Sequence, residues 1–203
     1  MGLLITFEGG EGCGKSTQAK ALWKKLQQQI VPTILIHEPG STALGNRIRR
    51  LLKRKQGCPI TPQVELLLFA ASRAQLVSEV IHPALKEDKI VICDRFSHST
   101  FAYQGYGRGL DLDTIEMVGN LAGQNLKPDL VILLDILSEQ GLARKHTPRD
   151  PFEQEELSFH HRVREGYLKM AAADPKRWLV IDASLPKRGI ARIVWDKVSQ
   201  AIA

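Results

Sequence analysis

The chain has 203 residues, 43% of them hydrophobic and 25% charged, and it carries a formal net charge of +6. This length and composition are those of a globular domain with a full core, and they exclude a disordered or low-complexity chain. No apolar run approaches the roughly 20 residues that span a bilayer, and the first residues lack the basic and apolar regions of a signal peptide. We therefore expect no membrane partner.

Three cysteines, Cys13, Cys58 and Cys93, are too widely spaced to indicate a metal site or a disulfide framework. Reduced thiols are the simplest interpretation, and they predict a cytoplasmic protein.

The basic residues are densest between positions 47 and 55, where the chain has Arg47, Arg49, Arg50, Lys53, Arg54 and Lys55. On a helix these side chains would spread over more than one face. We expect a solvated helix with one or two members turned to a phosphate. A nucleic-acid partner is the less favoured alternative, because no aromatic side chains interleave with the basic ones to stack bases.

The strongest motif lies at residues 3–17. Leu3–Phe7 is a short apolar run suited to a buried parallel strand, and the residues after it fit G-x-x-x-x-G-K-[ST]. Its glycines let the backbone wrap around phosphate oxygens, Lys15 reaches the β- and γ-phosphates, and the Ser16 hydroxyl can hold Mg²⁺. A helix follows, with its positive end toward the same phosphates. The motif predicts a nucleoside triphosphate site formed by Gly9, Gly10, Glu11, Gly12, Cys13, Gly14, Lys15, Ser16 and Thr17.

Four further apolar runs predict strands over Thr33–His37, Lys89–Asp94, Leu130–Leu134 and Leu179–Asp182. The helix after the phosphate loop is predicted from an apolar face formed by Ala19, Leu22, Trp23, Leu26 and Ile30. Later helices are predicted over 43–55, from Thr61 and Pro62 to about 85, and over 111–126, 138–144, 153–173 and 186–202. Strands that alternate with helices predict an α/β fold, a doubly wound five-stranded parallel sheet flanked by helices, in one domain over residues 1–203.

An arginine interrupts an apolar helix face, since Leu66, Phe69, Arg73 and Val77 are spaced to lie together. A buried guanidinium needs an acceptor. That acceptor is either a nearby carboxylate, in a structural salt bridge, or a ligand, with Phe69 as a flat surface for a base. The spacing alone leaves both alternatives open.

The third strand ends in Asp94 and Arg95. Ligands bind at the carboxyl ends of strands in such sheets, and a carboxylate there is a typical second Mg²⁺ contact in phosphate-loop proteins. Arg95 is suited to clamp a phosphate. Ser99 and Thr100 and then residues 102–109 form a polar, aromatic and glycine-rich stretch, and the simplest interpretation of its latter part, 102–109, is a flexible loop.

These blocks together resemble the thymidylate (dTMP) kinase family, in order along nearly the whole chain. The resemblance is carried by the phosphate loop and by residues 38–40, 68–75, 94–96, 99–100, 102–105 and 134–135. It implies a P-loop kinase that phosphorylates dTMP to dTDP with MgATP, a step in dTTP synthesis, and that forms a homodimer. The short chain and the absence of a guanine-reading Asn-Lys-x-Asp disfavour a motor protein and a switch GTPase.

The resemblance also implies residue roles. Phe69 would stack on thymine, Arg73 would reach a base oxygen, and Thr100 would bind the base edge, with Gln104 nearby. Tyr103 would lie beside the sugar and disfavour a ribose. Arg95 and Arg49 would hold the acceptor phosphate, and Glu11 the sugar 3′-hydroxyl. The implied substrate-binding residues are Glu38, Arg49, Phe69, Arg73, Arg95, Thr100, Tyr103 and Gln104, and the implied Mg²⁺ contacts are Ser16 and Asp94.

The expected reaction needs positioning and charge neutralisation rather than a general base, because a phosphomonoester is mostly a dianion at neutral pH. A deoxynucleoside kinase would need such a base, and Glu38 is the carboxylate to test for it. Another nucleoside monophosphate or deoxynucleoside kinase of the same fold is the alternative.

One subgroup of the family carries a transition-state arginine in the phosphate loop, where this chain has Gly12. The chain resembles the other subgroup, whose lid supplies the arginine. We expect a mobile lid at about 143–152, with Arg144 and Arg149 as candidates, so the predicted catalytic residues are Lys15, Glu11, Arg95, Arg144 and Arg149. The Asp-Arg pair expected after the lid is replaced near Phe152 and Glu153.

Overall fold

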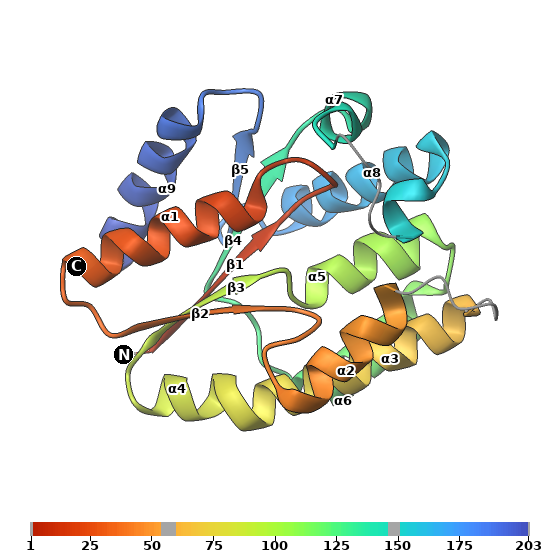
Figure 1. Cartoon of the computed structure of the whole chain (residues 1–203), viewed down its shortest axis with the longest axis horizontal. Coiled ribbons are helices and arrows are strands. Elements are labelled where there is room, and N and C mark those ends of the chain that lie inside the picture. The colour runs from red at the N-terminus through yellow and green to blue at the C-terminus, as the bar shows by residue number, and fades with distance from the viewer. Residues whose placement is uncertain (1, 54–59, 146–150, 203) are drawn as a thin grey trace.

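The computed structural model describes residues 2–53, 60–145 and 151–202. Its centre is a five-stranded parallel sheet in the order β2-β3-β1-β4-β5 (Figure 1). The strands are β1 (Leu3–Glu8), β2 (Thr33–His37), β3 (Ile90–Asp94), β4 (Leu130–Asp135) and β5 (Trp178–Asp182). The predicted fold is confirmed, and each predicted strand agrees with the structure to within one residue at either end.

One face of the sheet is covered by α1 (Lys15–Gln28) and α9 (Lys187–Ile202) (Figure 1). The core between them combines Leu22 and Leu26 of α1 with apolar residues of β1, β3, β4 and α9. The prediction that Ile30 continues this apolar face is wrong. The helix ends at Gln28, and Ile30 adopts a left-handed φ of 60° with 91% of its surface exposed.

The opposite face is covered partly by one continuous helical rod of α3 (Pro62–Leu76), the π-helical η1 (Val77–Ile81) and α4 (His82–Lys86). This confirms the long predicted helix. Thr61 caps it as predicted, because its side chain accepts a hydrogen bond from the Val64 amide. Two more helices contact the rod, α2 (Ala43–Lys53) and α6 (Leu112–Gly123). Residues Arg54, Lys55 and Cys58 lie outside the described residues.

The rest of this face is covered by α8 (Leu157–Ala173), α5 (Ser97–Thr100) and the π-helical η2 (Phe101–Gly107). The flexible loop expected over 102–109 is therefore helical through Gly107. Its glycines allow close packing rather than flexibility, because a Cβ on Gly107 would lie 2.6 Å from the Phe159 ring. η2 packs tightly against α8 as a result.

Two further segments complete the described chain, α7 (Ser138–Ala143) and the 3₁₀ turn η3 (Pro151–Gln154). Two predicted helices are shorter than expected. The helix predicted over 111–126 ends at Gly123, since Gln124 and Asn125 adopt left-handed φ angles of 51° and 58°. The helix predicted from 153 begins at Leu157, after η3.

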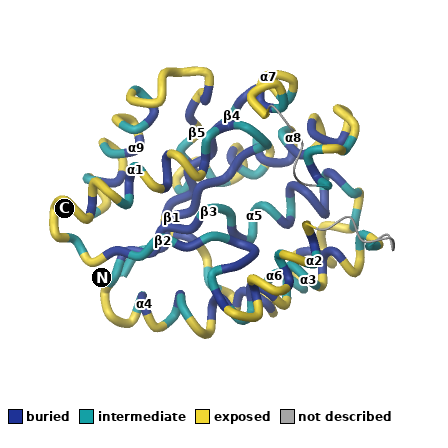
Figure 2. The backbone as a smooth tube through the Cα atoms, viewed as in Figure 1, coloured by how far each residue is buried: buried dark blue, intermediate teal, exposed yellow. Residues whose placement is uncertain are grey.

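The register aligns polar residues at one edge of the sheet. Phe7 pairs with Asp94, Asp94 pairs with His37, and Asp135 pairs with Asp182 at the carboxyl ends of their strands. Buried residues run through the three central strands, β3, β1 and β4, up to this edge (Figure 2). Within the described part of the chain, no helix is long and apolar enough to cross a membrane.

Candidate active site

The phosphate loop connects β1 to α1 and is shaped by its glycines. Gly9, Gly12 and Gly14 have φ angles of 138°, 67° and 95°, which favour glycine. Gly14 lies at the N-cap of α1, so the first amides of that helix face the loop. This geometry fits the phosphates of a nucleotide, because an anion is stabilised by such amides and by the helix dipole.

Lys15 is buried at the start of α1, and its ammonium group lies over the loop. Nζ donates hydrogen bonds to the carbonyl oxygens of Gly9 at 2.9 Å and Gly10 at 2.6 Å. The loop thus holds a positive charge at the place where the sequence motif predicts phosphates.

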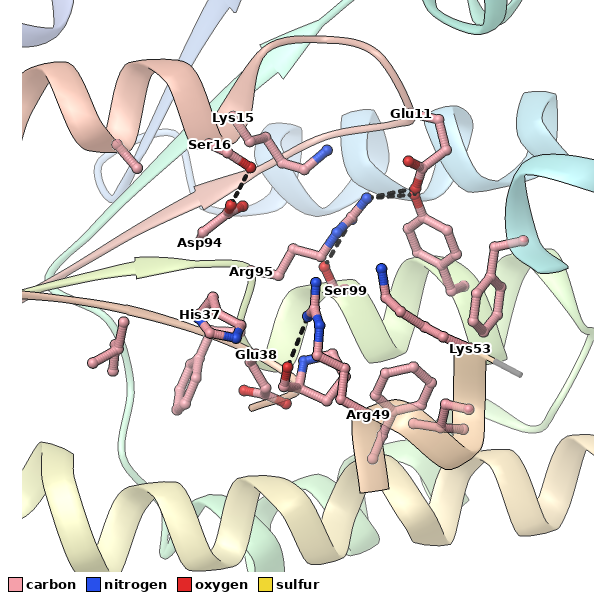
Figure 3. A pocket seen from close by; sticks show the side chains of 18 of the residues that line it. Glu11, Lys15, Ser16, His37, Glu38, Arg49, Lys53, Asp94, Arg95 and Ser99 are labelled. Carbon is pink, nitrogen blue, oxygen red and sulfur yellow. Dashed lines mark hydrogen bonds and ion pairs between the residues drawn. The ribbon is translucent and has the colours of Figure 1, made fainter. Parts of the chain in front are cut away.

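A hydroxyl and a carboxylate meet beside the loop, where Ser16 Oγ donates a hydrogen bond to Asp94 Oδ2 (Figure 3). These hard oxygen donors suit Mg²⁺, which is typically held by one or two protein ligands, waters and phosphate oxygens. No cluster of three or more His, Cys, Asp or Glu side chains suited to a metal occurs among residues 2–53, 60–145 and 151–202. The donor set therefore fits a cation shared with a nucleotide rather than one enclosed by the protein.

Arg95 follows β3 with a left-handed φ of 70° and turns its guanidinium toward the loop (Figure 3). Nη2 donates to Glu11 Oε1 at 2.7 Å and to the Tyr103 hydroxyl at 2.9 Å, and that hydroxyl donates to Glu11 at 2.7 Å. Burial alone would raise the pKa of Glu11, but the charges of Arg95 and Lys15 outweigh it and lower that pKa to about 2. Glu11 is therefore a carboxylate at neutral pH.

Behind Arg95 lies a fully buried carboxylate that the sequence analysis missed. Glu8 accepts hydrogen bonds from the Phe96 amide at 2.8 Å, from Ser99 at 2.7 Å and from the Tyr167 hydroxyl at 2.9 Å. Burial raises its pKa against the effect of these bonds and of Arg95. The available signal was a carboxylate that ends an apolar strand, the same signal that identified Asp94.

Arg73 projects from α3 and is only 1% exposed. It forms a salt bridge with Glu38 at 2.5 Å, and its Nη2 donates to Thr100 Oγ1 at 2.6 Å. The structural alternative for Arg73 is thus confirmed, while a ligand contact stays a prediction. The second oxygen of the carboxylate, Glu38 Oε2, is buried and has no hydrogen-bond partner among the described residues.

Aromatic side chains form the adjacent part of the site. Phe69 and Tyr103 both pack against Phe152, with ring centroids 6.0 Å and 5.8 Å apart. Phe152 belongs to η3, where the sequence departs from the pattern expected after the lid, and its place in the site was not predicted. Gln104, buried on η2, donates from Nε2 to Glu65 Oε1 at 2.8 Å.

Basic side chains of α2 approach from the other side. Arg49 Nη1 donates to the Pro39 carbonyl at 2.8 Å, and Lys53 lines the same cavity one turn further on (Figure 3). Burial and the charge of Arg49 lower the pKa of the nearby His37, although Asp94 opposes them. Arg49 and Lys53 of the basic stretch thus line the cavity, and their contact with a phosphate stays a prediction.

Helix α7, just before the predicted lid, approaches the phosphate loop very closely. A Cβ on Gly12 would lie 1.9 Å from the Gly141 carbonyl oxygen of α7. No side chain fits at position 12, so an arginine there is incompatible with this packing. Arg144 lines the cavity and donates to the Ala183 carbonyl at 3.0 Å, whereas Arg149 lies outside the described residues.

A single cavity of about 670 Å³ joins these groups. That volume suits a small-molecule site. Lys15 and Asp94 lie at one part of it, and Phe69 and Arg73 at another. Gly9, Gly10 and Cys13 contribute to the loop but do not line the cavity, and all other predicted site residues that the structure describes line it, namely Glu11, Gly12, Gly14, Lys15, Ser16, Thr17, Glu38, Arg49, Phe69, Arg73, Asp94, Arg95, Thr100, Tyr103, Gln104 and Arg144.

Residues 7–193 match the family model described as thymidylate kinase. The chain belongs to the thymidylate kinase family. It is 52% identical to a thymidylate kinase of Dehalococcoides mccartyi over 98% of this chain and 96% of that protein. It is 44% identical to a thymidylate kinase of Trichlorobacter lovleyi over 99% of each chain. A crystal structure of thymidylate kinase from Ehrlichia chaffeensis superposes with a TM-score of 0.80 at 33% identity, covering 97% of this chain and 98% of that one. The family and P-loop kinase fold expected from the sequence are confirmed.

Proposed function

We propose that the chain transfers the γ-phosphoryl group of ATP to the phosphate of dTMP, giving ADP and dTDP. The observation that carries this proposal is the continuity of one cavity. It joins the phosphate loop to a recess with an aromatic ring, a buried guanidinium and short polar side chains. A donor nucleotide and an acceptor nucleotide therefore have room to meet. Family membership supports dTMP as the acceptor.

The donor half of the site would hold the triphosphate through the loop amides and Lys15. Ser16 and Asp94 are the side chains that would hold Mg²⁺. Bound there, the ion would neutralise charge on the phosphates. The loop residues are already held in place by the glycine conformations and by the hydrogen bonds of Lys15 to the loop carbonyls. This preorganisation means that little rearrangement is needed when phosphates bind.

The acceptor half would take dTMP with its base against Phe69 and its phosphate near Arg95 and Arg49. Arg73, Thr100 and Gln104 present polar groups where the edge of a base would lie, and Tyr103 and Glu11 would face the sugar. Arg95 is aligned by acceptors on several elements, including the Gly9 carbonyl, Ser99 and Tyr167. Held in this way, it can position an acceptor phosphate without a large loss of side-chain entropy.

The arrangement favours a phosphate acceptor over a sugar hydroxyl. A phosphate dianion is already a nucleophile at neutral pH, whereas a hydroxyl needs a base. Glu38, the candidate base, is engaged with Arg73 at 2.5 Å. Burial raises its pKa, and the charge and hydrogen bond of Arg73 act against that rise. A carboxylate held in this salt bridge is suited to orient Arg73 rather than to remove a proton.

Arg144 is the described candidate for stabilising the transition state. Its guanidinium lines the cavity from the end of α7 while donating to the Ala183 carbonyl. A lid over residues 143–152 stays a prediction, because much of that segment lies outside the described residues. Arg149, within it, is the second sequence-based candidate.

The test is the release of ADP with MgATP and a panel of acceptors: dTMP, dUMP, UMP, CMP, AMP, GMP and thymidine. We expect the highest kcat/KM with dTMP and the next highest with dUMP, since a missing methyl group is discriminated less strongly than a lost hydrogen bond. Little turnover is expected with thymidine. Efficient turnover of thymidine would instead assign a deoxynucleoside kinase with Glu38 as the base, and no turnover with any acceptor would contradict the proposal.

We also propose a homodimer in the cytoplasm, without a nucleic-acid partner. α3 and α6 pack side by side and expose apolar side chains, among them Leu67, which is 58% exposed, Met117, which is 73% exposed, and Leu121, which is 83% exposed (Figure 1). A second copy would bury this strip. Sedimentation should show a dimer that Leu121→Glu dissociates, while Ile30→Glu, at an equally exposed site away from the strip, leaves it intact. A dimer unaffected by Leu121→Glu would place the interface elsewhere.

A further inference from the structure

Phe69, Arg73, Thr100 and Gln104 form the part of the cavity proposed to bind the base, called here the base recess. Two of its groups, Thr100 and Gln104, are neutral, and each can act as hydrogen-bond donor or acceptor. In both cases a charged neighbour removes that ambiguity. Arg73 Nη2 donates to Thr100 Oγ1 at 2.6 Å, so the hydroxyl accepts that bond and keeps its own proton to donate. Gln104 contacts a second ion pair, which the proposed reaction does not use.

That second ion pair consists of Glu65 on α3 and Arg108 just after η2. Arg108 contacts both carboxylate oxygens of Glu65, with Nε 3.3 Å from Oε1 and Nη2 3.2 Å from Oε2. Its remaining amine, Nη1, donates to Glu155 at 2.7 Å. The guanidinium also lies over the rings of Phe152 and Phe159, at 5.6 Å and 5.0 Å from their centroids. Arg108 is thus fixed from three sides, and it fixes Glu65 in turn.

An ionised carboxylate is an acceptor only. Glu65 Oε1, which accepts from Gln104 at 2.8 Å, can therefore face only the amide nitrogen of that side chain. If the Gln104 amide were turned over, its carbonyl oxygen would lie against a carboxylate oxygen in a buried position, which is strongly unfavourable. The carbonyl Oε1 of Gln104 accepts no hydrogen bond from any residue that the structure describes, and the side chain lines the cavity.

We infer that Glu65 is a positioning residue for base selectivity: through its bond to Gln104 it makes this glutamine present an acceptor, not a donor, to the edge of the bound base. The inference rests on the proposed function and adds to it. An acceptor at Gln104 beside donors at Thr100 and Arg73 matches the N3–H and the neighbouring carbonyl of thymine or uracil. Cytosine reverses this pattern, since its N3 accepts and its exocyclic amine donates. Glu65 would thus weaken the binding of cytosine nucleotides through the orientation of Gln104, without a direct contact to the base.

The test compares kcat/KM for dTMP and dCMP in the wild-type chain and in Glu65→Gln. A glutamine at this position can accept or donate, so Gln104 is free to turn. We expect the dTMP-to-dCMP ratio to fall about tenfold or more, because mismatched polar groups in a pocket typically carry selectivity of at least that size. The KM for ATP should stay unchanged. Glu65→Asp, which remains an acceptor only, should lower kcat/KM for both nucleotides and keep their ratio.

Glu155→Gln is the matched control, because it removes the other carboxylate of Arg108 and leaves the bond between Glu65 and Gln104 in place. Its ratio should equal that of the wild type. If Glu65→Gln lowers kcat/KM equally for dTMP and dCMP, Glu65 has only a structural role and the inference is overturned. If the wild-type chain fails to use dTMP at all, the proposed function fails first, so the two failures can be told apart.

A measurement on the wild-type chain covers the case in which Glu65→Gln does not fold. The amide resonances of Gln104 in ¹⁵N-labelled protein should show one side-chain hydrogen protected from exchange, both before and after dTMP is added. Loss of that protection on binding dTMP would mean that the amide leaves Glu65 when the base arrives, and it would overturn the inference.

Discussion

The two halves of the cavity are built in different ways. The phosphate loop is a backbone structure, in which three glycines with positive φ angles and the amides at the start of α1 form the anion site. The base recess is made of side chains from α3, from α5 with the adjoining η2, and from η3, three segments that are far apart in sequence. Buried ion pairs hold these side chains, such as Arg73 with Glu38 and Arg108 with Glu65. One half depends on local conformation and the other on tertiary pairing.

This difference predicts how each half responds to substitution. In the loop, a functional side chain can be removed while the backbone site remains. In the recess, Arg73 would both bind the base and stabilise the fold, because its deletion leaves the charge of Glu38 buried without a partner. Binding and stability should therefore separate in the loop and be coupled in the recess.

Arg73→Met should have the largest effect on stability. It leaves Glu38 buried and unpaired, and the loss of one partner from a buried ion pair typically costs about 3–5 kcal/mol. Chemical denaturation followed by circular dichroism measures the loss. The double variant Arg73→Met with Glu38→Met should recover much of the stability, because both charges are then absent.

The kinetics of the same double variant sharpen the comparison. If Arg73 also contacts the base, the double variant should have a higher KM for dTMP than the wild-type chain, although its stability is restored. A double variant with wild-type KM for dTMP would restrict Arg73 to its structural salt bridge and remove it from the proposed binding site.

Lys15→Ala should show the opposite behaviour. A preorganised positive group at the site of charge development is typically worth about 10²–10³ in kcat, so the rate of ADP formation should fall by that factor. The glycines remain, but the hydrogen bonds of Lys15 to the Gly9 and Gly10 carbonyls are lost, so the unfolding free energy should fall by about 1–3 kcal/mol, less than in Arg73→Met. Lys24→Ala, at an exposed position on the same helix, is the control and should alter neither quantity. A loss of stability in Lys15→Ala as large as that in Arg73→Met would contradict the proposed difference between the phosphate loop and the base recess.

Glu11 belongs to the phosphate loop but forms an ion pair with Arg95, which follows β3. It therefore tests whether a loop residue with a tertiary partner also contributes to stability. Its pKa in the folded chain is lowered from 4.5 to about 2. A lowered pKa means that the unfolded chain binds the proton more readily, so the stabilisation is present above pH 4.5 and is lost as the pH falls toward 2. The stability advantage of the wild-type chain over Glu11→Gln should shrink by about 2 kcal/mol between pH 6 and pH 3. Urea titrations of both proteins at each pH measure it, and a constant difference would contradict the assignment.

The same contrast explains what the sequence could predict. The strands and the phosphate loop were predicted correctly, since apolar runs and the glycine spacing are local signals. The flexible loop expected over 102–109 was wrong, because Gly107 allows close packing against Phe159, which lies about fifty residues further along the chain. Ile30 was misplaced because the helix ends in a left-handed turn that apolar spacing does not encode.

Within the site, the spacing predicted that Arg73 of α3 needs an acceptor but could not choose Glu38, which directly follows β2. Glu8, Glu65 and Arg108 were missed because each acts through a partner on another element. Their roles depend on tertiary contacts, such as the 2.9 Å bond from Tyr167 to Glu8, that one sequence does not specify.

The smallest predicted effect belongs to Tyr103, whose ring and hydroxyl have separate contacts. The ring packs against Phe152, while the hydroxyl bonds to Glu11 and Arg95. Tyr103→Phe keeps the ring and removes one hydrogen-bonding group, so we expect a loss of about 1 kcal/mol in stability. If the ring itself excludes a ribose, Tyr103→Phe should change the ratio of dUMP to UMP turnover only a few-fold, and Tyr103→Ala should lower it much further. This nucleotide pair differs only in the 2′-hydroxyl, so an equal fall in both variants would assign ribose exclusion to the hydroxyl and its link to the phosphate loop.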